Sequence, residues 1–395
     1  MEHLINQAVR QMQVSGIRKI ANMVAKYPDV INLTLGQPDF TTPEHIKIAG
    51  KRAIDEDKTF YTHNAGLFEL RKAASDYLYQ KYQLSYHPDD EVIITTGASE
   101  AIDIAFRTIL EEGCEVILPA PVYPGYGPLI QLCGAVPVYV DTSANGFKLN
   151  AEMIQNNLTE KTRCLVLPYP SNPVGSILDE KTLTEIADLL KDKEIFIITD
   201  EIYSELTYGK KHTSIASFPE MRDKTIVING LSKSHSMTGW RIGVTFAPAY
   251  LTAEMVKVHL YNATCASSIS QYAAVEAFTR GIEDPIEMKK EYQARRDYVY
   301  DRLVSMGFEV DKPDGAFYMF PSIKQWNMKS FDFVTQLLEK RRVAVVPGDV
   351  FSEFGEGYIR IAYAYSMETL AEGCNRIEQF VQTLNMEKGG KGGCK

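Results

Sequence analysis

The chain has 395 residues, 45% hydrophobic and 24% charged, a composition typical of folded globular proteins. Its formal net charge of −9 leaves no basic field that would draw it to nucleic acid or to an anionic membrane. No apolar run reaches the ~18 residues that cross a bilayer, and Met1–Asn6 lacks a secretory signal pattern, so we expect a cytoplasmic protein. The six cysteines form no C-x-x-C pair, so we expect no metal site.

Short apolar runs recur through the middle of the sequence. Each is hydrophobic almost throughout, which indicates strands covered on both faces, as in a mainly parallel sheet between layers of helices. Helical stripes lie between them, for example over residues 101–110 and 183–190. We therefore predict a large α/β domain over residues 45–280. Its seven strands are expected at Val92–Thr95, Val116–Leu118, Val136–Val140, Cys164–Leu167, Ile195–Thr199, Thr225–Asn229 and Ile242–Phe246.

The remainder of the chain has a different pattern. A long charged helical segment begins near Asp284, and an amphipathic stripe covers Leu370–Leu384. A smaller α+β domain is expected from residues 281–387, and residues 1–44 are expected to pack with it. The Gly- and Lys-rich segment 388–395 is expected to be disordered. Candidate strands of the small domain are Ala316–Phe320, Val343–Val346 and Tyr358–Ala362.

Lys233 follows the predicted strand Thr225–Asn229 and is flanked by Ser232 and Ser234. Most lysines are solvated surface charges. A lysine at the end of a core strand is different, because a desolvated amine loses its proton readily and becomes a nucleophile toward an aldehyde. An anion held near Ser232 and Arg241 would complete a pyridoxal 5'-phosphate (PLP) site.

Two further motifs stand at predicted strand ends. Gly97, Ala98 and Ser99 open a helix, where backbone amides and the helix dipole favour an anion, although Ser99 with Glu100 is also ordinary capping chemistry. Asp200 closes the most apolar strand, in the region where parallel sheets bind ligands. A buried, unpaired carboxylate is costly, so a cation is expected beside Asp200, and a protonated pyridine nitrogen would serve. The alternative is that Asp200 caps the helix that follows the strand.

Three further side chains indicate a binding site only when they are considered together with the other motifs. Asn172 lies in a Pro-rich turn after a strand and can donate an amide hydrogen bond, although turn chemistry explains it equally well. Tyr123 offers a flat surface for ring stacking. Arg360 alternates with Ile359 and Ile361 along a strand and could bind a carboxylate through two parallel bonds; a solvated strand arginine is the alternative.

The succession of these motifs resembles the class I/II aminotransferases of PLP fold type I, over almost the whole chain. Leu33–Phe40 and Tyr61–Gly66 also resemble the N-terminal motifs of that family. The runs Ile228–Gly243 and Cys265–Ser270 are especially similar to a branch of the family that serves lysine biosynthesis. The resemblance implies the cofactor PLP, amino-acid and 2-oxo-acid substrates, and a homodimer in which Tyr61 reaches the phosphate bound by the neighbouring subunit.

The resemblance also implies individual roles. Lys233 would hold PLP covalently and carry the substrate proton. Asp200 would keep the ring nitrogen protonated, Tyr203 and Asn172 would donate to the phenolate oxygen, and Tyr123 would stack on the ring. The phosphate would be held by Gly97, Ala98, Ser99, Ser232, Arg241 and the neighbour's Tyr61, and the substrate carboxylate by Arg360, Asn172 and the Gly36 backbone.

One position departs from the family pattern. Many relatives have a phosphate-binding serine three residues before the lysine, where this chain has Gly230, so the phosphate is expected to depend more on Ser232.

The expected reaction is a transamination in two half-reactions, with glutamate as the amino donor. The residues leave aspartate, aromatic and other specificities open. A PLP-dependent C–S β-lyase shares most of these residues and is the main alternative. A ligand-sensing regulator would need an attached basic DNA-binding module, which the sequence lacks.

Overall fold

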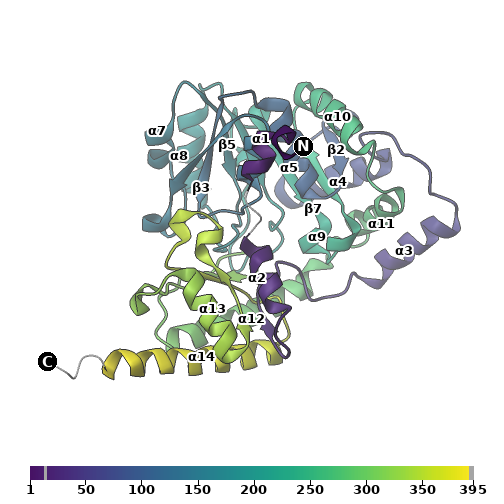
Figure 1. The fold of residues 1–395 in the computed structure, drawn as a ribbon. Coiled ribbons are helices and arrows are strands. Elements are labelled where there is room, and N and C mark those ends of the chain that lie inside the picture. The colour runs from purple at the N-terminus through teal and green to yellow at the C-terminus, as the bar shows by residue number, and fades with distance from the viewer. Residues whose placement is uncertain (13–15, 391–395) are drawn as a thin grey trace.

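The computed structural model describes residues 1–12 and 16–390, which form a large and a small part (Figure 1). The large part is built on a sheet that confirms the seven predicted strands. These are β2 (Val92–Thr95), β3 (Glu115–Ala120), β4 (Val136–Asp141), β5 (Thr162–Leu167), β6 (Phe196–Asp200), β7 (Thr225–Gly230) and β8 (Gly243–Phe246).

The strand order is β2-β8-β7-β6-β5-β3-β4. Strand β8 is antiparallel to both neighbours, β2 and β7, and the other pairs are parallel. The carboxyl ends of β3, β5, β6 and β7 therefore meet along one edge, where ligands of such sheets bind.

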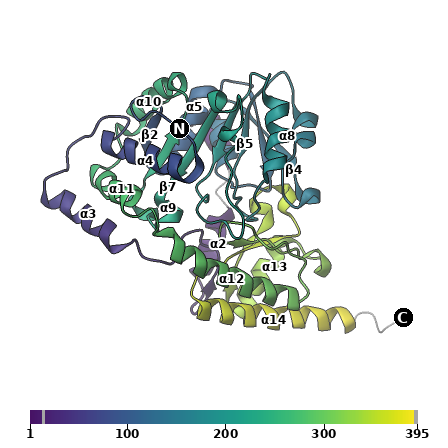
Figure 2. The same cartoon turned by 180° about the vertical axis from the view of Figure 1, so that it is seen from behind.

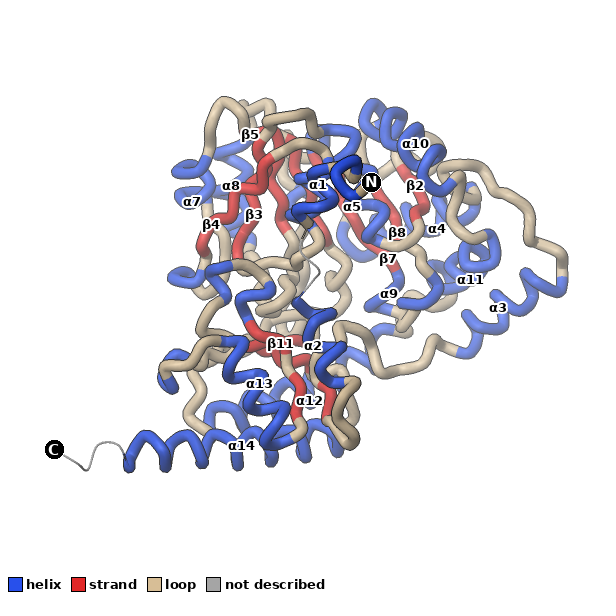
Figure 3. The backbone as a smooth tube through the Cα atoms, viewed as in Figure 1, coloured by secondary structure: helices blue, strands red, loops and turns tan. Residues whose placement is uncertain are grey.

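Helices cover both faces of this sheet, as Figures 2 and 3 show. Side chains of one strand alternate between the two layers: Val116 and Leu118 belong to one hydrophobic cluster and Ile117 to another. The first layer contains α5 (Ala98–Ile109), α6 (Tyr126–Leu132) and α10 (Ala249–Ala263). The second contains α3 (Glu44–Asp55), α4 (Phe68–Tyr82), α7 (Ala151–Asn157), α8 (Glu180–Leu190) and α11 (Ser268–Thr279).

The small part lies below the large sheet in Figure 1. It contains an antiparallel sheet, order β11-β12-β9, and a parallel pair of β1 with β10. The predicted strand Val343–Val346 is thus divided between two sheets. The strands are β1 (Ile31–Asn32), β9 (Tyr318–Met319), β10 (Val343–Ala344), β11 (Val346–Pro347) and β12 (Ile359–Ala362). The helices are α2 (Gly16–Val24), α12 (Pro285–Ser305), α13 (Ser330–Arg341) and α14 (Met367–Gly390).

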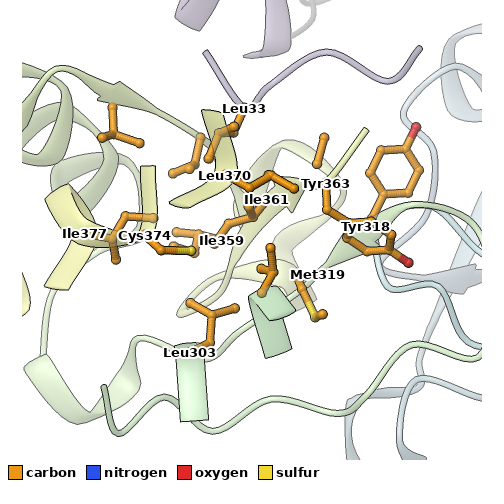
Figure 4. Packing of buried hydrophobic residues seen from close by; sticks show 14 of the residues in the cluster. Leu33, Leu303, Tyr318, Met319, Ile359, Ile361, Tyr363, Leu370, Cys374 and Ile377 are labelled. Atoms are coloured by element: carbon orange, nitrogen blue, oxygen red, sulfur yellow. The ribbon is translucent and has the colours of Figure 1, made fainter. Parts of the chain in front are cut away.

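One hydrophobic cluster joins the two ends of the chain in the small part. Leu33 packs there with Ile361 of β12 and with Leu370 and Ile377 of α14 (Figure 4). Ile20 of α2 belongs to the same cluster. This packing supports the proposed domain division, in which residues 1–44 join residues 281–387.

Helix α14 continues to Gly390, three residues into the segment 388–395 expected as a disordered tail; residues 391–395 lie outside the described residues.

Within the described ranges, every helix is too short or too polar to span a bilayer. The short helix α1 (Gln7–Gln11) begins at Asn6, whose side chain accepts hydrogen bonds from the Ala8 and Val9 amides.

Gly243, at the start of β8, allows the turn before α5 to approach the sheet. A Cβ at Gly243 would lie 2.4 Å from the Gly97 carbonyl carbon and 2.6 Å from the Ala98 nitrogen. These are backbone atoms, which cannot rotate away. We expect Gly243→Ala to lower the free energy of unfolding by roughly 1–3 kcal/mol, as overpacking does, measured by denaturant titration.

Gly239→Ala is the matched control, because a Cβ at Gly239 meets nothing within 4 Å. Equal stabilities of the two variants would contradict the steric argument.

Candidate active site

A cavity of about 320 Å³ opens at the carboxyl edge of the large sheet. It is lined from both parts of the molecule: Asp200 ends β6, whereas Tyr318 and Arg360 come from β9 and β12. The predicted site residues in its wall are Gly36, Ala98, Ser99, Tyr123, Asn172, Asp200, Tyr203, Ser232, Lys233, Arg241 and Arg360.

Lys233 is half-buried in the short helix α9 (Leu231–Ser234), which follows β7 directly. Its Nζ donates a hydrogen bond to the Gly36 carbonyl oxygen at 2.7 Å, which brings the N-terminal segment to the amine. Burial, followed by the charges of Arg241 and Arg360, lowers the pKa of Lys233 to about 8, while Asp200 acts in the opposite direction. The amine is therefore easier to deprotonate than an ordinary lysine.

Asp200 is buried and has two neutral hydrogen-bond donors. The Tyr126 hydroxyl donates to Oδ2 at 2.7 Å, and the Ile202 amide donates to Oδ1 at 3.2 Å. Burial raises the pKa of Asp200, and these two hydrogen bonds oppose the rise. These neutral donors do not balance the negative charge of the Asp200 carboxylate, so a cation placed beside it would be stabilised.

Tyr203 and Tyr318 are both buried, and their hydroxyl oxygens are 2.7 Å apart. The Lys233 Nζ lies 6.0 Å from the centre of the Tyr203 ring. Tyr123 is 37% exposed and meets Tyr126 edge to face, with ring centroids 5.5 Å apart. Aromatic surface therefore lies beside the lysine and the aspartate.

Arg360 is only 2% exposed, so the solvated alternative is wrong. Its Nη1 donates to Asn172 Oδ1 at 2.9 Å and its Nη2 to the Thr34 carbonyl oxygen at 2.5 Å. The Nε has no hydrogen-bond partner among the described residues. A buried guanidinium with an unused donor is suited to a carboxylate.

The turn between β2 and α5 lies against Arg241. Gly97 has φ +80°, and a Cβ there would fall 2.2 Å from Arg241 Nη2. Glu100 fixes the turn from behind, because its Oε2 accepts from the Thr96 amide at 2.5 Å and its Oε1 lies 2.8 Å from His259 Nδ1. The open helix start and the guanidinium together can hold an anion.

Gly230, where the family resemblance led us to expect a serine in many relatives, has no room for a side chain. A Cβ at this position would lie 2.9 Å from the Ile242 carbonyl oxygen and 3.2 Å from the Gly243 Cα. The close approach of β7 and β8 thus requires the glycine. Ser232, two residues further on, is buried and lines the cavity.

Two predicted site residues lie outside the cavity wall, and two important tyrosines were not predicted. Gly97 is behind the wall, against Arg241, and Tyr61 is 84% exposed on the surface. Sequence reasoning missed Tyr126 and Tyr318. Tyr126 stands in the same Pro- and Gly-containing run, Pro121–Tyr126, as the predicted Tyr123, and this proximity in the sequence could have indicated it.

The profile of the family "Aminotransferase class I and II" matches residues 28–377. The chain therefore belongs to this family and is a PLP-dependent aminotransferase.

Individual relatives cover nearly the whole chain. It is 59% identical to a probable N-acetyl-LL-diaminopimelate aminotransferase of Bacillus subtilis (strain 168), over 98% of this chain and 99% of the relative. It is 42% identical to an aspartate aminotransferase of Pyrococcus abyssi, over 93% and 96% of the two chains. The crystal structure of an aromatic aminotransferase from Pyrococcus horikoshii OT3 superimposes with a TM-score of 0.88 at 40% identity, covering 92% of this chain and 99% of that one.

The residues of the cavity fit PLP. The Asp200 carboxylate, with neutral donors alone, suits a protonated ring nitrogen, and the unprotected start of α5 beside Arg241 suits a phosphate. Lys233 lines the same cavity as these two groups and has a lowered pKa. Each polar part of the cofactor thus has a matching group in the protein.

The lowered pKa of Lys233 predicts the pH dependence of covalent PLP attachment. Only the neutral amine reacts, and at pH 7 a pKa of about 8 leaves roughly a tenth of the amine neutral, against under one part in a thousand for an ordinary lysine. When PLP is added to the cofactor-free protein, the rate should rise about tenfold per pH unit up to pH 8 and then level off. Stopped-flow absorbance measures this rate.

Arg360→Gln removes one positive charge near the amine and should move the break in this profile to higher pH. A wild-type rate that still climbs beyond pH 10 would contradict the lowered pKa.

Proposed function

We propose that the enzyme transfers an amino group from glutamate to N-acetyl-2-amino-6-oxopimelate, which would make it an N-acetyl-L,L-diaminopimelate aminotransferase of lysine biosynthesis. The relative with 59% identity carries that name, with the qualifier "probable". The sequence runs Ile228–Gly243 and Cys265–Ser270 favour the same branch of the family. For the class of reaction, the observation that carries the proposal is the meeting of Lys233, Asp200 and Arg360 in one cavity.

Lys233 is proposed to bind the cofactor covalently and to move the substrate proton. Bound PLP supplies an aldehyde that takes up the amino group and a ring that withdraws electrons from the substrate Cα. A lysine displaced by substrate would be a free base within the cavity, and in the unliganded protein the pKa of this amine is already lowered to about 8. A base with a pKa near neutrality can both accept and return the Cα proton.

Asp200, Tyr203, Asn172 and Tyr123 are proposed to hold the cofactor ring. Asp200 keeps the ring nitrogen protonated, and Tyr126 orients that carboxylate through its 2.7 Å hydrogen bond. Tyr203 and Asn172 donate to the phenolate oxygen, and Tyr123 packs on the ring. The amide of Asn172 can do so because its Oδ1 is already engaged by Arg360.

The phosphate is proposed to bind the backbone of Gly97, Ala98 and Ser99 together with Ser232 and Arg241. The substrate α-carboxylate is proposed to bind Arg360, Asn172 and the Gly36 backbone. Anchoring the two ends of the reacting pair in this way orients the Cα–H bond toward Lys233.

Tyr61 is proposed to complete the phosphate site of a second copy of the chain. It is 84% exposed, next to Phe60, which is 80% exposed, and such aromatic surface is common at interfaces. We expect sedimentation equilibrium to give twice the chain mass. A single-chain mass at micromolar concentration would contradict the homodimer.

Half-reactions with single amino donors test the proposed substrates. PLP-loaded enzyme should react with glutamate and with N-acetyl-L,L-diaminopimelate, seen as a shift of the cofactor absorbance to its amine form. Aspartate or aromatic amino acids reacting at higher kcat/KM would instead favour the specificities named for the relatives from Pyrococcus.

Lys233→Ala is the control, and it should abolish turnover with every donor. Pyruvate release from cystathionine without a 2-oxo acid would identify a C–S β-lyase and contradict the transamination. Full activity of Lys233→Ala would remove the lysine from the mechanism.

A further inference from the structure

The hydroxyl of Tyr318 lies at the junction of three parts of the proposed site. It is 2.7 Å from the Tyr203 hydroxyl. A Cβ added to Gly36 would fall 2.4 Å from it, so it also touches the backbone that accepts the Lys233 hydrogen bond. Tyr318 is 1% exposed and comes from β9 of the small part, whereas Tyr203 follows β6 of the large part.

The ring of Tyr318 lies under the Arg360 guanidinium. Arg360 Cζ is 4.5 Å from the ring centroid, within the range of a cation–π contact. A neighbouring positive charge makes a phenol a better hydrogen-bond donor, because it stabilises negative charge on the oxygen. Burial raises the pKa of the Tyr318 hydroxyl, and the charge of Arg360 opposes this rise.

The two hydroxyls can be ordered in only one way if Tyr203 serves the cofactor. A tyrosine hydroxyl has one proton, and a Tyr203 that donates this proton to the phenolate oxygen can only accept from Tyr318. Tyr318 must then be the donor of the 2.7 Å bond. Hydrogen bonds in such a chain polarise one another, so a stronger donation by Tyr318 strengthens the donation by Tyr203.

We propose that Tyr318 is a positioning residue that orients the Tyr203 hydroxyl and transmits to it whether a carboxylate occupies Arg360. The proposal rests on the proposed function, since it uses the roles given there to Tyr203 and Arg360. A carboxylate on Arg360 partly neutralises the guanidinium and weakens the donation by Tyr318 and then by Tyr203. The phenolate oxygen of bound PLP would then retain more negative charge, which would favour a proton on Lys233 Nζ while that atom is joined to the cofactor.

The test is the pH midpoint at which the absorbance of the bound cofactor titrates in the holoenzyme. Tyr318→Phe should raise this midpoint by roughly 0.3–1 pH unit, because one hydrogen bond is lost and its effect is passed on through Tyr203. Tyr203→Phe should raise it further, and the double variant should equal Tyr203→Phe alone. Such non-additivity indicates that Tyr318 affects the cofactor through Tyr203.

A second readout uses maleate, a dicarboxylate that cannot donate an amino group. Maleate should raise the midpoint in the wild type and raise it less in Tyr318→Phe. The Asn172 contact with Arg360 remains, so part of the response should persist.

Tyr363→Phe is the matched control. Tyr363 is as buried as Tyr318 and belongs to the same hydrophobic cluster, but its hydroxyl donates to the Ala316 carbonyl oxygen at 3.1 Å. Its loss should change the thermal unfolding midpoint by about as much and leave the absorbance titration unchanged. An equal titration shift in both variants would mean a merely structural role and would overturn the proposal.

A Tyr318→Phe midpoint equal to that of the wild type would also overturn it, as would a shift that adds fully to that of Tyr203→Phe. Failure of the proposed function looks different. In that case the wild type itself would show no titrating cofactor band, or would retain it in Lys233→Ala.

Discussion

The site depends on the cationic side chains of Lys233, Arg241 and Arg360 lying around one cavity that the buried carboxylate of Asp200 also lines. Arg241 and Arg360 both lower the pKa of Lys233, and Asp200 is the group that raises it. Arg360 is buried and Lys233 partly buried, and positive charges in such places are costly unless anions meet them. The phosphate that we propose at Arg241 and the carboxylate that we propose at Arg360 would balance these charges in succession. Ligands that bind only the folded chain also stabilise it, so cofactor and substrate contribute to the fold that binds them.

Much of this architecture could be predicted from the sequence. The apolar runs of the large domain predicted the seven strands because continuous hydrophobicity requires a cover on both faces. Lys233 and Asp200 could be singled out because a charged residue directly after such a run lies at the carboxyl edge of the sheet. The helix ends and the division of Val343–Val346 between two sheets could not, since both depend on tertiary partners rather than on local pattern.

The unpredicted parts of the site are contacts between distant segments. Tyr318 belongs to an aromatic run, Ala316–Phe320, whose pattern is that of a core strand, and only its approach to Tyr203, 115 residues away, distinguishes its hydroxyl. The Glu100–His259 contact behind the turn between β2 and α5 spans 159 residues. Arg360 was ambiguous for the same reason, because Asn172 and Thr34, which engage it, are 188 and 326 residues distant.

The pairing of β1 with β10 has a consequence for the order in which the molecule is assembled. Ile31 is held beside Val343, so the first strand must wait for more than three hundred further residues before it has a partner. When the ribosome has synthesised all of β2 to β8, the chain contains Lys233 and Asp200. Tyr318, Arg360 and the residues of the small part that pack against Leu33 have not yet been synthesised. The growing chain thus contains Lys233 and Asp200, to which we assign the chemistry, before it contains Arg360, which we propose binds the substrate carboxylate.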